Sequence, residues 1–211
     1  MIRFQVSKSL KWLKGFLSLG AVYNLFIYFV GRFGFSKLLL SAKYVPYTPG
    51  LKILDLGCGP GTNSTLFQPS DYLGIDISEK YINSARKANP AYKFESFNFL
   101  ELSSDFNEKF DIIIMAGLIH HLSDEQVNIF LRKAYNLLKN SGHLITIDNC
   151  LHDKQSVIKR KIILLDRGQN VRHVNQLLKF ADTSQFKFTA YIEEDLLLIP
   201  YTHFILTCKK N

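Results

Sequence analysis

Two carboxylates and a run of glycines are the strongest chemical signal in this sequence. The run is Asp55-Leu56-Gly57-Cys58-Gly59-Pro60-Gly61, and it follows a short apolar segment. It predicts a tight turn after a buried strand, in which glycines let the backbone approach a ligand closely. Asp76 ends a second apolar segment, where its carboxylate could accept both hydroxyls of a ribose. A glycine-rich turn alone is a weak signal, but the turn together with this acid indicates a ribose-containing ligand.

The glycine spacing argues against a dinucleotide site. A nicotinamide-binding turn reads Gly-x-Gly-x-x-Gly, whereas Gly57, Gly59 and Gly61 alternate here. A pyrophosphate also needs a helix N-terminus close by, and Asp55, two residues before the first glycine, would repel it. The turn therefore favours a ligand without phosphates.

Strands and helices alternate after residue 50. We expect strands at 51–56, 72–77, 92–97, 110–115, 143–148, 186–193 and 201–209. We expect helices at 62–67, 78–88, 123–138 (stopped by 140–142) and through most of 153–182, with a break near 167–168. Such alternation implies an α/β fold: a doubly wound, mostly parallel seven-stranded sheet with an antiparallel C-terminal strand. Ligands bind at the carboxyl ends of the strands in such sheets, so the functional residues should follow the strands.

The first 49 residues have a different pattern. An almost wholly apolar run at 15–31 precedes the sequence YVPYTPG at 44–50, whose two prolines and glycine predict a linker. The run is shorter than the roughly 20 residues of a membrane-spanning helix and contains Asn24. No cleavage site of the signal-peptide type follows it. We therefore expect residues 1–49 to be a helical extension that caps a domain at 50–211. Peripheral contact of this helix with a membrane surface is the alternative.

The composition is that of a basic globular protein. Apolar residues make up 47% and charged residues 21%, which argues against disorder. The formal net charge is +8, but the 26 Lys and Arg residues are scattered, so we do not expect nucleic acid as a partner. Three widely separated cysteines argue against a disulfide framework and favour the cytoplasm. The oligomeric state cannot be inferred from these features.

Four segments together resemble the class I S-adenosylmethionine-dependent methyltransferases, in particular their small-molecule members. Their first motif is similar to ILDLGCGPG at 53–61, and their second to LGIDIS at 73–78. Their fourth-strand motif is similar to FDIIIMAGLIHHL at 110–122, and the following helix, turn and strand to LLKNSGHLITID at 137–148. The resemblance implies a methyltransferase enzyme that uses S-adenosylmethionine as its cofactor and a small molecule as its methyl acceptor.

The resemblance also implies roles in cofactor binding. The glycine turn would pass under the methionine part, with Asp55 near its ammonium group. Asp76 would hold the ribose, and Ile77 would pack on the adenine. Asn98 stands where the family usually has aspartate, and its amide oxygen could still accept from the adenine amino group. The backbone carbonyl of Ala116 could bind the methionine amine. The full predicted set is Asp55, Gly57, Cys58, Gly59, Asp76, Ile77, Asn98, Phe99 and Ala116.

Two adjacent histidines follow the fourth predicted strand. His121, slightly favoured over His120, could be a general base that faces the methyl acceptor. Alternatively, these rings support the loop through hydrogen bonds and the reaction depends on positioning alone. We expect no metal site, because adjacent histidines diverge and no carboxylate spacing supports them. Further charged residues, which either bind substrate or form a solvated helix face, are Asp166, Arg167, Arg172 and His173.

Two other functions are compatible with these motifs. The positive charge suggests an RNA- or DNA-modifying methyltransferase. Enzymes that methylate base amines usually carry an Asn/Asp-Pro-Pro-aromatic motif after the fourth strand, whereas this chain has Met115-Ala116-Gly117-Leu118. A non-catalytic S-adenosylmethionine-binding module would show the same motifs as an enzyme. The sequence does not specify the acceptor, although the apolar N-terminus hints at a hydrophobic one.

Overall fold

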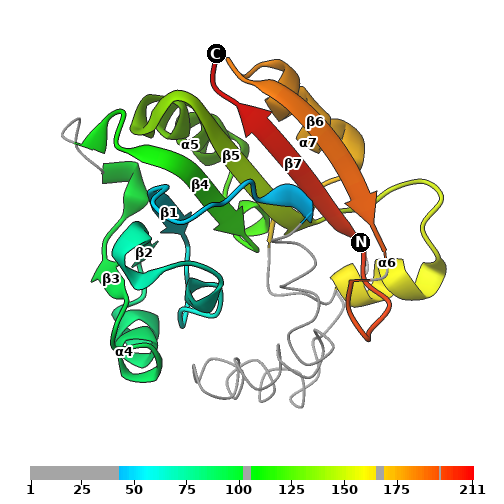
Figure 1. Cartoon of the computed structure of the whole chain (residues 1–211). Coiled ribbons are helices and arrows are strands. Elements are labelled where there is room, and N and C mark those ends of the chain that lie inside the picture. The colour runs from blue at the N-terminus through cyan, green and yellow to red at the C-terminus, as the bar shows by residue number, and fades with distance from the viewer. Residues whose placement is uncertain (1–42, 102–105, 165–168, 195) are drawn as a thin grey trace.

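A seven-stranded sheet forms the centre of the molecule (Figure 1). The computed structural model describes residues 43–101, 106–164, 169–194 and 196–211. The strand order is β3-β2-β1-β4-β5-β7-β6. The strands are β1 (Ile53–Leu56), β2 (Tyr72–Asp76), β3 (Lys93–Ser96), β4 (Phe110–Ala116), β5 (Leu138–Asn149), β6 (Lys187–Glu193) and β7 (His203–Lys209). Strands β1 to β5 pair in parallel, and β7 is antiparallel to both β5 and β6. This confirms the predicted fold class.

Helices cover both faces of the sheet because alternate strand residues point to opposite faces. The α-helices are α4 (Glu79–Ala88), α5 (Asp124–Leu137), α6 (Val157–Leu164) and α7 (Val174–Asp182). Apolar residues of α5 and α7 pack with one face, which includes Leu54, Met115 and Leu144. Residues of α4 pack with the other face, which includes Ile53 and Ile145. No described helix is long and apolar enough to cross a membrane.

Helix α5 illustrates how the sequence determines a local element. Ser123 caps its first turn: the Ser123 hydroxyl accepts from the Gln126 amide, and the Gln126 side chain accepts from the Ser123 amide. Its buried residues recur at helical spacing and are Val127, Phe130, Leu131, Ala134 and Leu137. The helix therefore begins directly after the loop that follows β4, and it holds one end of that loop.

Three local predictions differ from the structure. The helix predicted at 62–67 is only a short 3-10 turn at Ser64–Leu66, in which the Ser64 hydroxyl donates to the Gly61 carbonyl at 2.8 Å. Residues 140–142 do not form a separate stop, because β5 already begins at Leu138, and its register on β4 shifts at that point. The helical stretch expected at 153–182 with a break near 167–168 corresponds to α6 and α7, but α6 begins only at Val157 and α7 only at Val174.

The predicted N-terminal extension falls mostly on residues 1–42, which lie outside the described residues. The described part begins at Lys43. Tyr44 is buried, its ring centroid lies 4.9 Å from that of Tyr191 on β6, and its hydroxyl donates to Glu193. The residues just before the expected boundary at 49/50 therefore pack on the edge strand of the sheet, and the boundary itself remains a prediction.

Candidate active site

The glycine turn leaves β1 with its backbone bound to the neighbouring strand. The amides of Gly57 and Cys58 both donate to the Ile75 carbonyl on β2, at 2.8 and 3.1 Å. Gly59 has φ +54°, and a Cβ placed on it would meet no atom within 4 Å. A Cβ on Gly57, at φ +72°, would lie only 2.8 Å from the Leu118 side chain. The turn is therefore packed against the protein at Gly57 and open at Gly59, where a ligand can approach the backbone.

Asp76 lies at the carboxyl end of β2 beside this open side. Its Oδ2 accepts from the Gly59 amide at 2.9 Å, and its Oδ1 accepts from the Ser78 amide at 2.8 Å. These two bonds hold the carboxylate in one orientation, while each oxygen retains capacity to accept a further bond. The next side chain, Ile77, is 74% exposed and is the most exposed large apolar residue described. Asp76 and Ile77 thus present an oriented acceptor next to an uncovered apolar surface.

Two members of the predicted set, Asp55 near the end of β1 and Cys58 in the turn, are buried. Asp55 is fully buried, and its Oδ2 accepts from the Tyr72 hydroxyl at 2.7 Å. Burial, reinforced by the nearby Asp55 charge, raises the pKa of Tyr72 well above its usual value. Burial also raises the pKa of the Cys58 thiol, so Cys58 is a protonated packing residue and no nucleophile. In this structure Asp55 connects β1 to β2 through Tyr72, and its expected contact with the cofactor ammonium is still a prediction.

The residues after β3 and β4 complete this end of the sheet. The Asn98 Oδ1 accepts from the Leu100 amide at 3.1 Å, and its Nδ2 donates to Glu101 at 2.8 Å. Phe99 packs edge-on against Phe130, with ring centroids 5.5 Å apart, so it contributes to the core. Ala116 ends β4 and is partly exposed. Because β4 lies next to β1 in the sheet, the carboxyl end of β4 lies beside the glycine turn.

The two histidines lie in different surroundings on the short turn Ile119–His121. His120 is buried, and its Nδ1 lies 2.5 Å from the Asp148 Oδ1 at the end of β5. The other Asp148 oxygen accepts from the Ile119 amide at 2.5 Å. His121 is exposed, with its ring centroid 4.1 Å from that of His120. His120 thus fits the loop-supporting alternative, whereas His121 is accessible to a second substrate.

Arg172, which is distant in sequence, also stabilises this loop. Its side chain is buried, its Nη1 donates to the Ile119 carbonyl at 3.0 Å, and its Nη2 donates to the Leu122 carbonyl at 2.7 Å. Its Nε and Nη2 also bind Asp124 at 2.9 and 2.7 Å. Arg172 is therefore neither a solvated residue nor a substrate ligand, which corrects both sequence interpretations. His173 caps α7 by accepting from the Asn175 amide, while Asp166 and Arg167 lie outside the described residues.

Comparison with known proteins identifies the domain. The family model described as a methyltransferase domain matches residues 54–144. The ubiquinone biosynthesis O-methyltransferase of Rhodopseudomonas palustris is 30% identical over 115 residues, which cover 52% of this chain and 44% of that protein. The mRNA cap guanine-N(7) methyltransferase of Schizosaccharomyces pombe is 29% identical over 155 residues, which cover 63% of this chain and 41% of that protein. This chain contains a class I S-adenosylmethionine-dependent methyltransferase domain.

The methyltransferase fold extends beyond the matched segment. A S-adenosylmethionine-dependent methyltransferase from Archaeoglobus fulgidus superposes with a TM-score of 0.69 over 89% of this chain and 99% of that chain, at 19% identity. The chain spans less than half the length of the two curated relatives. The fold is therefore that of the family along nearly all of the described chain, whereas the acceptor differs among the relatives.

S-adenosylmethionine is the cofactor of this family, and the residues present fit it. The open side of Gly59 leaves space for a ligand that lies against the backbone, and a Cβ at that position would project into the same space. Asp76 can accept two ribose hydroxyls, and the exposed Ile77 can be covered by a flat apolar ring. Among the described residues, no group of three or more His, Cys, Asp or Glu is arranged to hold a metal ion.

A group of polar residues at the ends of β5, β6 and β7 was not predicted from the sequence. His203 opens β7 and lies opposite Asn149 on β5 and Glu193 on β6. Asn149 donates to the Tyr201 hydroxyl at 2.9 Å, and the Tyr201 ring lies 5.1 Å from that of His203. Burial lowers the pKa of His203 to about 4, so this ring is neutral at physiological pH. No local motif marks these residues, because only the insertion of β7 between β5 and β6 brings them together.

Proposed function

We propose that this methyltransferase domain transfers the methyl group of S-adenosylmethionine to a hydrophobic small molecule, with His121 acting on the acceptor. The observation that carries the proposal is the contrast between the two histidines. His120 is held by Asp148, while His121 is exposed at the same edge of the sheet as Gly59 and Asp76. An exposed histidine at this edge is where an acceptor would meet a base.

The chemistry needs alignment more than covalent help. S-adenosylmethionine supplies a methyl group on a positively charged sulfur, which becomes neutral when the methyl leaves. Asp76 and the glycine turn would orient the donor, and the Ile119–His121 turn would orient the acceptor; such positioning supplies much of the barrier reduction. If the acceptor is a hydroxyl, it must lose its proton as the new carbon–oxygen bond forms. Histidine is the side chain most often used as a general base, so His121 would take that proton.

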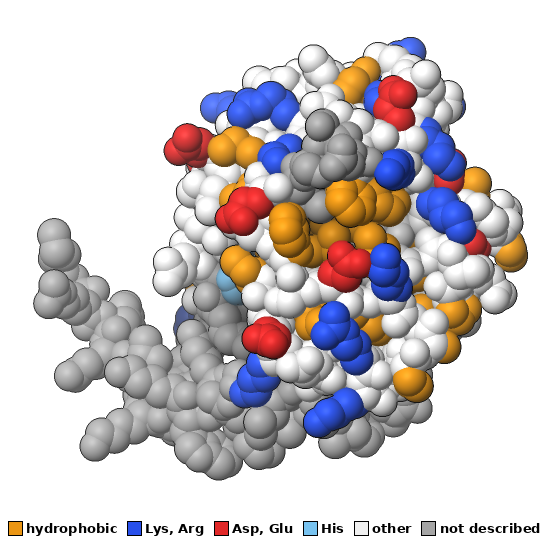
Figure 2. Space-filling view, turned by 90° about the vertical axis from the view of Figure 1, so that its left-hand side faces the viewer, with side chains coloured by type: hydrophobic (Ala, Val, Ile, Leu, Met, Phe, Trp, Pro, Cys, Tyr) orange, Lys and Arg blue, Asp and Glu red, His pale blue; other side chains and the backbone are white. Residues whose placement is uncertain are grey.

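A hydrophobic acceptor agrees with one relative, which acts in ubiquinone biosynthesis. RNA is the second candidate, because another relative methylates the mRNA cap and the chain has a net charge of +8. Figure 2 shows that on the face at the β3 edge the Lys and Arg side chains lie singly among Asp and Glu side chains, with no continuous basic stripe. A duplex or long strand is usually bound along such a stripe, so this face favours the small molecule.

An acceptor screen tests the proposal. The purified chain is incubated with S-adenosylmethionine and, separately, with hydrophobic phenols, phosphorylated amines and capped RNA, and formation of S-adenosylhomocysteine is measured. We expect turnover with a member of the phenol set. Turnover with capped RNA alone would reverse the assignment of the acceptor. Binding of S-adenosylmethionine by calorimetry without turnover on any class would instead indicate a non-catalytic binding module.

A further inference from the structure

The outward face of α6 is apolar. Val157, Ile158 and Leu164 are 68%, 64% and 57% exposed. With 3.6 residues per turn, these three positions share one face of the helix with Lys161. The buried Ile163 lies on the opposite face. A surface helix normally turns its polar residues to the solvent, so α6 exposes the side chains that are usually hidden.

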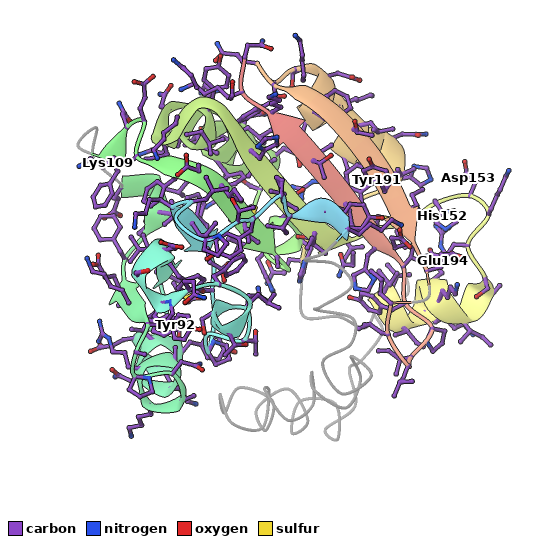
Figure 3. All side chains as sticks on the ribbon, viewed as in Figure 1. Tyr92, Lys109, His152, Asp153, Tyr191 and Glu194 are labelled. Carbon is purple, nitrogen blue, oxygen red and sulfur yellow. The ribbon has the colours of Figure 1, made fainter. Side chains whose placement is uncertain are left out.

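Contacts on the inner side of α6 fix this orientation. The Lys159 Nζ lies 3.0 Å from Glu194, just after β6, and His152 Nε2 lies 3.0 Å from the same carboxylate. Figure 3 shows His152 and Glu194 close together beside α6. Gln155 donates to the Thr202 hydroxyl at 2.7 Å, which connects the start of the helix to the approach to β7. The helix therefore cannot simply roll over to bury its apolar face without breaking these bonds.

The adjoining connection between β6 and β7 adds to the exposed apolar surface. Figure 1 shows this connection beside α6, and the Lys159–Glu194 ion pair joins the two segments. Leu198, within the connection, is 59% exposed, whereas Leu196 is buried. Four of the eight exposed large apolar residues described thus belong to these two neighbouring segments.

The charged side chains of residues 154–164 are all basic, and the exposed acid just before them, Asp153, lies 3.2 Å from His173 Nε2. Residues 154–164 include Lys154, Lys159, Arg160 and Lys161 and no Asp or Glu. Lys159 is engaged with Glu194, and the other three side chains belong to exposed residues. An anionic lipid surface complements this arrangement, because aliphatic side chains enter the boundary between headgroups and acyl chains while Lys and Arg attract the headgroups. A protein partner is less well matched, since protein interfaces concentrate their binding energy in Trp and Tyr as well as Arg, and under-use Leu and Val.

We propose that the outward face of α6, formed by Val157, Ile158 and Leu164 with Arg160 and Lys161, and assisted by Lys154 just before the helix, docks the protein on an anionic membrane surface. The contact is interfacial, and it is independent of the identity of the methyl acceptor. It would hold the β6–β7 connection, which carries Leu198, close to the bilayer.

Co-sedimentation of the full chain with vesicles tests this proposal. The vesicles are made of phosphatidylcholine alone or of phosphatidylcholine with phosphatidylserine. We expect binding to the anionic vesicles that weakens as salt is raised. Val157→Ser/Ile158→Ser should weaken it about tenfold or more because buried apolar area is lost. Arg160→Gln/Lys161→Gln should weaken it by about fivefold per residue and flatten the salt dependence. The matched control is Ile192→Ser, which removes an exposed aliphatic residue on β6.

Folding of each variant is verified by its melting temperature and its affinity for S-adenosylmethionine, which should match those of the parent. Equal vesicle binding by the parent and both α6 variants would overturn the proposal and place any membrane contact elsewhere in the chain. Loss of self-association in the α6 variants, without vesicle binding by the parent, would also overturn it, because the face would then join two copies of the chain.

Discussion

The glycine turn and the histidine loop lie at the same edge of the sheet but are built differently. The turn is held by nearby residues: Gly59 binds Asp76, which lies 17 residues further along the chain. The histidine loop is held by distant ones: Asp148 reaches His120 over 28 residues, and Arg172 reaches Ile119 over 53. A binding feature made of local contacts can be recognised from a short motif, whereas one made of long-range contacts emerges only with the whole fold.

The largest effect on cofactor affinity is expected at the glycine turn, which is held by nearby residues. Asp76→Ala removes the acceptor of two charge-assisted ribose hydrogen bonds, each worth about 1.5–3 kcal/mol. The affinity for S-adenosylmethionine should therefore fall by about 10²-fold or more, as measured by calorimetry. Glu79→Ala, an exposed acid at the start of α4, is the control and should bind normally. Unchanged affinity in the Asp76 variant would contradict the assignment of this edge as the cofactor site.

The two histidines should respond in opposite ways. With a hydroxyl acceptor, His121→Ala should lower turnover by about 10²–10⁴-fold while leaving cofactor affinity and melting temperature nearly unchanged. His120→Ala leaves the buried Asp148 without its ring partner, so it should lower the melting temperature. Turnover, cofactor affinity and thermal unfolding of both variants separate the two roles. Near-normal turnover in the His121 variant would show that the enzyme works by positioning alone.

A substitution at Arg172 removes the long-range contacts of the histidine loop without changing either histidine. Arg172→Met deprives the Ile119 and Leu122 carbonyls of a charged donor, at about 1.5 kcal/mol or more for each bond. We expect a loss of about 3 kcal/mol in the free energy of unfolding by urea, together with reduced turnover. Affinity for S-adenosylmethionine should change little, because the glycine turn does not depend on Arg172. A variant that lost cofactor affinity first would argue that the two regions are not separate.

The smallest effect is a pH dependence of stability. His203 is held neutral with a folded pKa of about 4, because burial outweighs the nearby charges of Asp148 and Glu193. The unfolded chain binds a proton near pH 6.5, so stability should fall as the pH drops from about 6.5 toward 4 and then level off for this group. The ceiling is about 3 kcal/mol, and solvent screening reduces it. In His203→Gln, the melting temperature should change less between pH 7 and pH 5 than in the parent. An unchanged pH dependence would mean that it comes from other groups, such as His143, whose pKa burial also lowers.

The sequence allowed the sheet and its cofactor side to be predicted because both have local signals. Runs such as Ile112-Ile113-Ile114 mark strands covered on both faces, and Ser123 marks the start of α5. The turn from Gly57 to Gly59 and the acid Asp76 were likewise identified by their spacing, and the structure brings them together. The boundaries were less accurate, as β5 shows by beginning at Leu138 directly after α5.

The remainder could not be predicted because it depends on contacts across the fold. Nothing near Arg172 in the sequence indicates that its guanidinium ends among the carbonyls of a loop some fifty residues away. His203 and Asn149 meet only because β7 enters between β5 and β6. The sequence predicts a helix near α6, but only the buried Ile163 and the Lys159–Glu194 pair in the structure show which side of that helix faces the protein.

The strand order also has a consequence for how the chain assembles. Strand β6 lies at the edge of the sheet and, among the described strands, pairs only with β7. It can therefore join the sheet only through a strand that follows it in the sequence. The two strands are close in sequence and can zip together as a hairpin before docking on β5, which avoids a long loop closure for β6 alone. The β6–β7 hairpin would then be the folding nucleus for this step. Thr189 and Thr207 face each other across the hairpin, and their φ-values should exceed that of Thr146 on β5.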